Sequence, residues 1–428
     1  MLVRYSVSNY KSFKNRASLS MVKSRGRLLS EQTINIKNRL SLLKGAVLYG
    51  ANASGKTNII DSFAFAQNFI LKGNKEKELI KVQPFLLQDI KDNSGTTFEF
   101  EFVLKENIYS YGFTVTPKEV IDEWLCEIHK SNDKYIYTRE KQEINIGKDY
   151  LSKEDFEELD ARKNFVRNNE LFLTKTIDLN SNVLKSYINW FESIQILRPN
   201  SKPIAITQIM KDSKFSQFLT KLLCDCDTGV KMVTTETVDL NSLKVPENIL
   251  SNIISELENE DCFIVLSTLE GEKAIAYLKN GEKKADVLRF VHQKEDGSEA
   301  FFSLGQESDG TRRLVELSPA LYSEDKKLLI IDELDRSLHP ALTQFLTDCV
   351  LKNNQERQLI ISTHETSLLN TRKIRRDEIW FINKNKKGES SLKPLSDFNQ
   401  RYDKELRKAY LDGRFYGVPR LGEKNGES

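Results

Sequence analysis

Cysteine is scarce in this sequence, and the few cysteines are scattered. The chain has 428 residues, of which 5 are cysteine and 9 are proline. Cys224 and Cys226 are separated by one residue instead of two, and no second cysteine pair accompanies them, so we do not expect a zinc site. An odd number of dispersed cysteines is also unlike a disulfide framework. It favours a reduced, cytoplasmic protein.

Long apolar runs and an excess of charge of one sign are missing as well. No run of about 18 apolar residues exists, and the N-terminus lacks the apolar segment of a signal peptide, so we expect neither a membrane span nor export. Lys plus Arg number 64 and Asp plus Glu number 62, which leaves a net charge of +2. This balance excludes a chain that is basic overall, but a local basic face for nucleic acid stays possible.

The most informative stretch is residues 45–63, GAVLYGANASGKTNIIDSF. It predicts a buried strand, a glycine-rich turn and the start of a helix, with the spacing G-x-x-x-x-G-K-[ST] of a phosphate-binding loop. Such a loop turns tightly and brings backbone N–H groups close to phosphate oxygens, while the lysine reaches the β- and γ-phosphates and the hydroxyl ligates Mg²⁺. The candidate nucleotide-binding residues are Gly50, Asn52, Ser54, Gly55, Lys56, Thr57 and Asn58, with Thr57 also a candidate metal ligand.

A second apolar run, residues 328–331, ends in the carboxylates Asp332 and Glu333. Four apolar residues in a row suit a parallel strand that is buried on both faces. Ligands of open α/β sheets bind at the carboxyl ends of such strands. We therefore predict that Asp332 helps to hold Mg²⁺ and that Glu333 polarises a water molecule for attack on the γ-phosphate.

Two further stretches add candidate residues. Residues 359–363 predict another buried strand, and His364 follows it, where a neutral imidazole can hydrogen-bond a phosphate or an attacking water. Upstream of the carboxylates, Ser308 and Gly310 open a predicted helix. Its N-terminal amides suit either a second phosphate-binding surface or an ordinary helix cap, and these residues taken alone favour the cap.

The remaining patterns divide the chain into three parts. Alternation in residues 98–102 and 109–113 predicts an antiparallel meander over roughly 97–138. From residue 150 the sequence is rich in Glu, Lys, Leu and Phe, which favours helices. We expect an N-terminal part of a nucleotide-binding domain at 1–149, a mostly helical insertion at 150–285 and the C-terminal part of the same domain at 286–428.

In order along the chain, these motifs resemble the ABC-type ATPase head shared by SMC, RecF-like and overcoming-lysogenisation-defect (OLD) proteins. The resemblance covers about residues 1–115 and 300–385. Its elements are the turn at residues 9–13, the Walker A loop at 50–58, a degenerate signature motif at 308–310, Walker B at Asp332 and Glu333, the D-loop residue Asp335 and the switch histidine His364. Gln83 is our candidate for the glutamine of the Q-loop.

The resemblance implies an α/β fold, with an ABC-type ATPase head that combines a parallel P-loop sheet and an antiparallel β meander, plus a mainly helical insertion. It also implies ATP and Mg²⁺ as ligands, with Thr57, Asp332 and Gln83 around the metal and Glu333 and His364 in catalysis. In such proteins ATP lies between two heads, so we expect a homodimer or higher oligomer. Ser308, Gly310 and Asp335 would then contribute to nucleotide binding, the first two on the partner's nucleotide.

Departures from this pattern narrow the comparison. The long coiled coil of SMC proteins is missing, and the sequence after His364 is too short for the Toprim nuclease domain of OLD proteins. Residues 406–419, with 172–175 and 189–191, resemble compact bacterial ATPases of phage-defence and abortive-infection modules. That resemblance implies an ATP-driven switch or sensor that works with a separately encoded, nuclease-like effector.

Two alternatives belong to other functional classes. One is a RecF- or SMC-like ATPase that repairs or binds DNA directly through the basic residues between 372 and 387, although such a charge run is more often a solvated face. The other is the ATPase subunit of a membrane transporter, which fits poorly because the meander and the insertion replace the expected coupling region.

Overall fold

The computed structural model describes residues 1–24, 29, 32–36, 40–88, 95–199, 206–259, 262–323, 326–353, 357–369, 373–398, 406–412 and 414–415. Contacts divide the chain into two compact units. The first unit comprises Met1–Arg198, Asp325–Leu334 and Gln344–Ser428, and the second comprises Pro199–Glu324 and Asp335–Thr343. In the part of the chain that the structure describes, no helix is long and apolar enough to cross a membrane.

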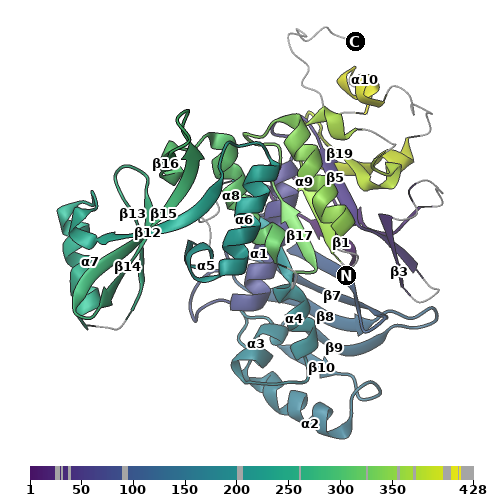
Figure 1. The fold of residues 1–428 in the computed structure, drawn as a ribbon. Coiled ribbons are helices and arrows are strands. Elements are labelled where there is room, and N and C mark those ends of the chain that lie inside the picture. Colours follow the sequence, from purple (N-terminus) through teal and green to yellow (C-terminus); the bar gives the residue numbers. More distant parts are fainter. Residues whose placement is uncertain are drawn as a thin grey trace. The chain divides into compact units, whose positions relative to one another are not determined.

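An antiparallel seven-stranded sheet forms one layer of the first unit, in the order β10-β9-β8-β7-β6-β1-β2 (Figure 1). Phe98, Phe100 and Phe102 alternate along β6 and are all fully buried, as the period-two pattern of the sequence predicts. The strands are β1 (Leu2–Ser8), β2 (Ala17–Ser20), β6 (Thr96–Leu104), β7 (Asn107–Val115), β8 (Val120–Glu127), β9 (Lys134–Glu140) and β10 (Glu143–Ile146).

A six-stranded sheet in the order β11-β17-β18-β5-β19-β20 forms the other main layer of this unit. All neighbours are parallel except β20, which pairs antiparallel with β19. Every residue of β5, β17 and β18 is buried, which explains why these strands are almost continuously apolar. The strands are β11 (Ile194–Leu197), β17 (Leu328–Ile331), β18 (Gln358–Ser362), β5 (Gly45–Tyr49), β19 (Ile379–Lys384) and β20 (Ser390–Pro394).

Helix α1 (Lys56–Lys72) packs into the aromatic core of the first unit. Phe63 of α1 stacks on Tyr5 of β1 with ring centroids 3.5 Å apart, and it meets Phe100 of β6 edge to face. Ile60 and Ala66 are buried in the same cluster, which also includes residues of β17 and β18. The helix that follows the glycine-rich loop is therefore fixed by contacts to both sheets.

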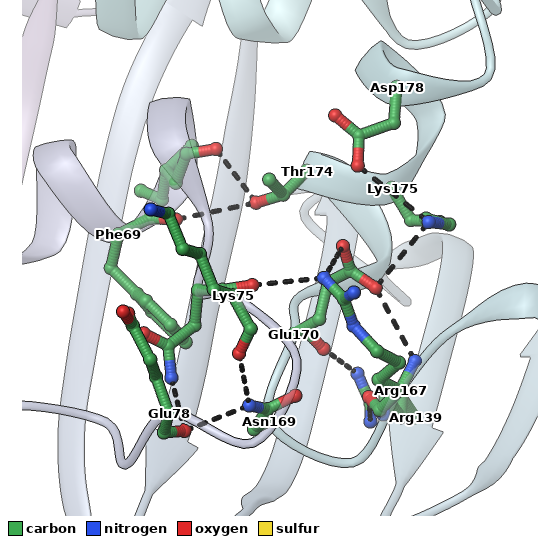
Figure 2. Close-up of polar contacts among 12 residues, drawn as sticks. Phe69, Lys75, Glu78, Arg139, Arg167, Asn169, Glu170, Thr174, Lys175 and Asp178 are labelled. Atoms are coloured by element: carbon green, nitrogen blue, oxygen red, sulfur yellow. Dashed lines mark hydrogen bonds and ion pairs between the residues drawn. The ribbon is translucent and has the colours of Figure 1, made fainter.

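Polar contacts hold the other end of α1 (Figure 2). The Thr174 hydroxyl donates to the Ile70 carbonyl at 2.7 Å, and Asn169 Nδ2 donates to the carbonyl oxygens of Lys75 at 3.1 Å and Glu78 at 2.9 Å. Residues 169–174 thus satisfy carbonyl groups that the end of the helix and the following loop leave open. The helix that begins at the glycine-rich loop is anchored at both ends.

Helix α3 (Phe172–Asp178) starts on a buried carboxylate of the meander. Glu123 accepts hydrogen bonds from the backbone N–H groups of Phe172 at 2.7 Å and Leu173 at 3.1 Å, and Arg139 lies 3.6 Å from its carboxylate. The remaining helices of this unit are α2 (Lys153–Arg162), α4 (Lys185–Glu192) and α10 (Leu406–Leu411), while α9 (Pro340–Asn353) begins within the second unit. Two short strands, β3 (Thr33–Ile36) and β4 (Leu40–Leu43), pair with each other.

The second unit is built on a five-stranded antiparallel sheet in the order β12-β15-β14-β13, with β16 also paired to β15. Helix α7 lies along one face, where Ile253 and Leu257 pack with Ala276, Ala285 and Val287 (Figure 1). The elements are α5 (Ile206–Lys211), α6 (Ser213–Asp225), β12 (Met232–Asp239), α7 (Glu247–Asn259), β13 (Ile264–Ser267), β14 (Lys273–Lys279), β15 (Glu282–Gln293), β16 (Glu299–Phe302) and α8 (Asp309–Tyr322).

The α/β class, the buried strands at 45–49 and 328–331 and the antiparallel meander are confirmed. The segment 150–285 contains helices α2 to α7, and it also contains β11, the sheet strands β12, β13 and β14 and the start of β15, which the sequence did not predict. The compact units also divide the chain at points other than 150 and 285.

Candidate functional site

The loop between β5 and α1, residues 50–55, is closely packed at both of its glycines. A Cβ atom on Gly50 would lie 2.4 Å from Ser54 Oγ. A Cβ atom on Gly55 would lie 2.7 Å from Ser390 Oγ, and the φ of +118° at Gly55 favours glycine in any case. Packing beneath the loop therefore requires glycine at these two positions, in addition to the tight turn that the sequence pattern implies.

The N-terminus of α1 is suited to an anion. Its N-cap is Gly55, which has no side chain to cap the first amides, and its first turn contains no acidic residue. The positive end of the helix dipole is therefore left uncompensated by the helix itself. Lys56 is 7% exposed, and its Nζ donates to the carbonyl oxygens of Gly50 at 2.7 Å and Ala51 at 3.2 Å, so its charge is held against the loop.

The other loop residues differ in exposure. Asn52 and Thr57 are exposed, and Asn58 is half-buried. Ser54 Oγ is buried and makes no hydrogen bond within the described part of the chain, which is an unusual state for a buried hydroxyl. A hydroxyl of this kind, beside a glycine-rich turn and a buried ammonium group, fits a ligand that accepts hydrogen bonds.

Hydroxyl groups from both ends of the chain meet under the loop. Asn58 Nδ2 donates to Ser12 Oγ at 2.8 Å, Ser12 Oγ lies 2.8 Å from Ser390 Oγ, and the Ser390 hydroxyl donates to the Ser54 carbonyl at 2.5 Å. Because a serine hydroxyl has one proton and a carbonyl only accepts, all three bonds form together when Ser12 donates to Ser390. We call these four residues the hydroxyl chain. It closes a ring around Gly55, Lys56 and Thr57.

The paired carboxylates lie at the carboxyl end of β17, beside the end of β18. Ser362, the last residue of β18, donates through Oγ to Asp332 Oδ1 at 2.5 Å and accepts from the Glu333 backbone N–H at 2.8 Å. Asp332 is fully buried and Glu333 is half-buried. One serine thus fixes the side chain of the first carboxylate and the backbone of the second.

Glu333 has a left-handed backbone, with φ of +51°. A non-glycine residue in this region is uncommon and is often found where a side chain must be aimed at a site. His364 follows β18 and is exposed, and Thr363 N–H donates to the Leu48 carbonyl of β5 at 3.2 Å. Because β17, β18 and β5 are parallel neighbours, Glu333, His364 and the glycine-rich loop all follow the same edge of the sheet.

Gln83 is placed next to the turn at residues 9–13, which also carries Ser12 of the hydroxyl chain. Lys11 N–H donates to the Gln83 carbonyl at 2.8 Å, and Phe85 N–H donates to Asn9 Oδ1 at 3.1 Å. The Gln83 side chain is exposed. Its proposed contact with a metal stays a prediction.

The turn at residues 9–13 is also tied to α1 by charge. Asp61 accepts from Lys11 Nζ and Arg198, both at 2.5 Å, and from the Tyr10 hydroxyl at 2.9 Å. Burial raises the pKa of Asp61, but the hydrogen bonds from Lys11 and Tyr10 outweigh this effect and leave the pKa below its usual value. Burial and the Asp61 carboxylate both raise the pKa of Tyr10. The turn is therefore locked to the helix at neutral pH.

Ser308, Gly310 and Asp335 belong to the second unit. Ser308 is the N-cap of α8, and its Oγ accepts from Thr311 N–H at 3.1 Å. A Cβ atom on Gly310 would lie 3.1 Å from the Ser337 carbonyl oxygen, so the first turn of α8 lies against the turn that follows Asp335. The structure thus brings these three residues together, while Gly50–Asn58, Glu333 and His364 come together in the first unit.

The proposed metal ligands are Thr57 and Asp332, with Gln83. In the part of the chain that the structure describes, no three His, Cys, Asp or Glu side chains gather as a metal site would require. Mg²⁺ in nucleotide sites takes only one or two protein ligands and completes its shell with phosphate oxygens and water. A hydroxyl at the start of α1 and a buried carboxylate at the end of β17 fit this donor set.

Comparison with known families gives one match. The model of a family described as "AAA domain, putative AbiEii toxin, Type IV TA system" matches residues 46–370, about three quarters of the chain. The matched range contains the glycine-rich loop, both carboxylates and His364. None of the curated proteins matches this chain.

Among solved structures, the chain is similar to SMC head domains. The SMC head domain from Thermotoga maritima is 14% identical over 92% of this chain and 98% of that chain, with a TM-score of 0.38. An SMC head bound to the C-winged helix domain of ScpA is 13% identical over 92% and 99%, with a TM-score of 0.41. An SMC head with an extended coiled coil, bound to the C-terminal domain of ScpA from Pyrococcus furiosus, is 13% identical over 92% and 97%, with a TM-score of 0.37.

Proposed function

The chain belongs to the family of AAA domains described as putative AbiEii toxin of a type IV toxin–antitoxin system, and from this premise we propose that it binds and hydrolyses ATP. One observation carries the proposal. The glycine-rich loop with Lys56, the carboxylates Asp332 and Glu333, and His364 follow three adjacent parallel strands at the same edge of one sheet. Phosphate, metal and attacking water need these groups within reach of one another.

Each candidate site residue of the first unit has a role in this proposal. The backbone amides at the start of α1 and Lys56 bind the β- and γ-phosphates. Thr57 and Asp332 hold Mg²⁺, which when bound neutralises charge on the phosphate oxygens. Glu333 accepts a proton from the attacking water, and His364 donates a hydrogen bond toward the γ-phosphate. Ser362 positions the Asp332 carboxylate through its hydroxyl and the Glu333 backbone by accepting from its N–H.

The proposal extends to two copies of the chain. Ser308 and Gly310 at the start of α8 offer amides and a hydroxyl that do not belong to the unit with Lys56. In our proposal they complete the ATP site of a partner copy, and Asp335 supports the turn that lies beside them. ATP binding would then close a dimer, and hydrolysis would open it.

The biological role that we propose is a switch or sensor in anti-phage defence, acting through a separately encoded, nuclease-like effector in the cytoplasm. Support comes from the toxin–antitoxin description of the family and from the compact, coiled-coil-free sequence. Direct DNA binding receives less support. Arg375, one of the basic residues in question, is buried in an ion pair with Asp377 at 2.8 Å, and Arg372 lies outside the described residues.

Replacement of Lys56 by alanine tests the proposal directly. The variant loses the cation that faces the phosphates, so we expect the affinity for Mg²⁺–ATP to fall about tenfold or more, since charge-assisted hydrogen bonds to phosphate are strong. Isothermal titration calorimetry measures the change. Lys72→Ala, an exposed lysine at the other end of the same helix, is the matched control. Equal affinities of Lys56→Ala and wild type, with both folded by thermal melting, would refute the phosphate-loop assignment.

The hydroxyl chain leads to a second prediction. Ser390→Ala removes the bond to the Ser54 carbonyl and leaves Ser12 without its acceptor, which we expect to lower the free energy of unfolding by about 1–2 kcal/mol. The loop would also become less well ordered, so ATP affinity should fall several-fold. Ser391→Ala changes an exposed neighbour on the same strand and should leave both quantities unchanged. If Ser390→Ala has unaltered stability and ATP affinity, the hydroxyl chain does not position the phosphate loop.

A further inference from the structure

The segment that carries His364 is fixed on both sides of this residue. Just before it, the Thr363 backbone N–H donates to the Leu48 carbonyl at 3.2 Å. Just after it, the Glu365 carbonyl accepts from the Tyr49 hydroxyl at 3.1 Å. Leu48 and Tyr49 are the last two residues of β5, the strand that leads into the glycine-rich loop. The backbone around His364 is therefore tied to the strand that carries the phosphate loop.

Two local hydrogen bonds shape the same segment. Thr363 Oγ1 accepts from the Glu365 N–H at 2.9 Å, which closes a compact turn around His364. The Glu365 carboxylate accepts from the Ser367 N–H at 2.7 Å, at the start of a short 3-10 helix, η5 (Thr366–Leu368). His364 itself is exposed. The direction of its imidazole therefore depends on where this turn and η5 are held.

Helix α10, near the other end of the described chain, adds a contact to η5. Arg407 Nε donates to Thr366 Oγ1, on the first residue of η5, at 3.0 Å. The two residues are 41 positions apart in the sequence. Arg407 is exposed, so its side chain can be changed without opening the core. The segment after His364 is thus held by α10 as well as by β5.

Aromatic contacts place α10 against the central strands. Tyr410 meets Tyr49 edge to face with ring centroids 5.5 Å apart, and it stacks on Phe381 at 5.7 Å. Tyr49 and Phe381 are register partners on the neighbouring strands β5 and β19. Phe415 also stacks on Phe381, with ring centroids 5.2 Å apart. Helix α10 and Phe415 therefore pack directly on the strand that ends at the phosphate loop.

We propose that Arg407 and Tyr49 position His364 for catalysis. Arg407 acts through the Thr366 hydroxyl, and Tyr49 acts through the carbonyl group that follows His364. A small displacement of a catalytic group lowers its contribution strongly, so these contacts should affect turnover more than nucleotide binding. The inference rests on the function proposed above, because it requires that His364 acts on the γ-phosphate. It gives α10 a role that the proposed function does not include.

Two substitutions at Arg407 test the hydrogen bond to Thr366. Arg407→Met keeps a long side chain without a donor, whereas Arg407→Gln has an amide nitrogen as many bonds from Cα as Arg407 Nε and therefore keeps a donor without the charge. We expect kcat to fall about threefold or more in Arg407→Met and to stay within about twofold of the wild type in Arg407→Gln. Lys408→Ala, at the next exposed position of the same helix, is the control and should keep the wild-type kcat.

Tyr49→Phe tests the second contact. It removes the hydroxyl that donates to the Glu365 carbonyl and keeps the aromatic ring that packs on Tyr410. We expect kcat to fall about threefold or more, as in Arg407→Met. Affinity for a non-hydrolysable ATP analogue, measured by calorimetry, should stay within about twofold of the wild type in all these variants, since His364 positioning matters for turnover.

A double-mutant cycle with His364→Ala separates positioning from a general structural role. Without the imidazole there is nothing left to position, so Arg407→Met should cause no further loss of kcat in the His364→Ala background. A purely structural contact would instead lower kcat by the same factor in both backgrounds. Phosphate release at high enzyme concentration measures the slow variants.

The possible results distinguish this inference from the function on which it rests. If His364→Ala is impaired but Arg407→Met or Tyr49→Phe has the wild-type kcat, or if Arg407→Met causes an equal loss in both backgrounds, the inference is wrong and the proposed ATPase function stands. Equal losses in Arg407→Met and Arg407→Gln would also refute the hydrogen bond as the cause. Wild-type turnover in His364→Ala would refute the proposed role of His364 and, with it, this inference.

Discussion

Glu333→Gln should bind ATP almost as tightly as the wild type and hydrolyse it at least about a hundredfold more slowly, because an amide cannot accept the proton of the attacking water. The substitution preserves side-chain volume. The Glu333 backbone N–H still donates to Ser362 Oγ, so the left-handed turn and the Asp332 side chain should stay in place. Turnover is measured by phosphate release under saturating ATP, and binding is measured by calorimetry.

A matched control distinguishes the loss of the catalytic carboxylate from a general effect of replacing glutamate by glutamine. Glu157→Gln makes the same chemical change on an exposed helix of the first unit, away from the sheet edge, and should leave turnover unchanged. Wild-type turnover in Glu333→Gln would mean that another group accepts the proton. His364 follows the neighbouring strand at the same edge, so His364→Ala would be the next variant to measure.

Local sequence patterns were sufficient to predict the glycine-rich loop and the paired carboxylates of this site. The glycine spacing at 50–55 and the apolar run before Asp332 each lie within a few residues, and each determines one strand and the loop that follows it. Their convergence follows from a general property of parallel sheets, in which loops at carboxyl ends share an edge. The sequence was therefore sufficient to place Lys56, Asp332 and Glu333 at one edge of a sheet.

Long-range contacts explain what the sequence did not predict. Ser12 and Ser390 are 378 positions apart, and they meet only because β20 pairs with β19, which in turn pairs with β5. Ser362 is a strand residue whose role depends on the adjacent strand β17. No short motif marks either serine. A search for hydroxyl residues at the ends of strands next to a phosphate loop would have included Ser362 but not Ser390.

The sheet of the second unit was missed for another reason. In β12 each face carries both valine and threonine, and β14 alternates between alanine and larger residues, so the contrast between the two faces is weak. Helices α6 and α7 precede β12 and β13 along the chain, and helical segments dominate the composition of residues 150–285. The signal that would have identified the sheet is the β-branched content of short windows, such as the valine and threonine residues of β12.

Gly310→Asp should abolish ATPase activity while leaving the protein folded and able to bind ATP at its own phosphate loop. An aspartate in the first turn of α8 is favourable for the helix, so the fold should tolerate it. The same carboxylate would add negative charge where, in our proposal, a partner copy presents its γ-phosphate. Gly310→Ala is the control, because it introduces the same Cβ atom 3.1 Å from the Ser337 carbonyl oxygen without the charge. Most activity should remain in Gly310→Ala.

Mixing Gly310→Asp with Lys56→Ala shows whether the two sites act across a dimer. Each variant is inactive alone, but a mixed dimer carries both lesions in one ATP site and leaves the other intact. If the copies exchange at random and one site works alone, about a quarter of wild-type activity should return at equal concentrations. Light scattering of differently tagged chains demonstrates the mixed dimers. If activity stays at zero although mixed dimers form, either both sites must work together or Lys56 and Gly310 serve the same ATP within one copy. ATP-dependent dimers of Lys56→Ala with wild type, purified through one tag, separate these two outcomes: half activity per chain favours independent sites, and none favours obligatory cooperation.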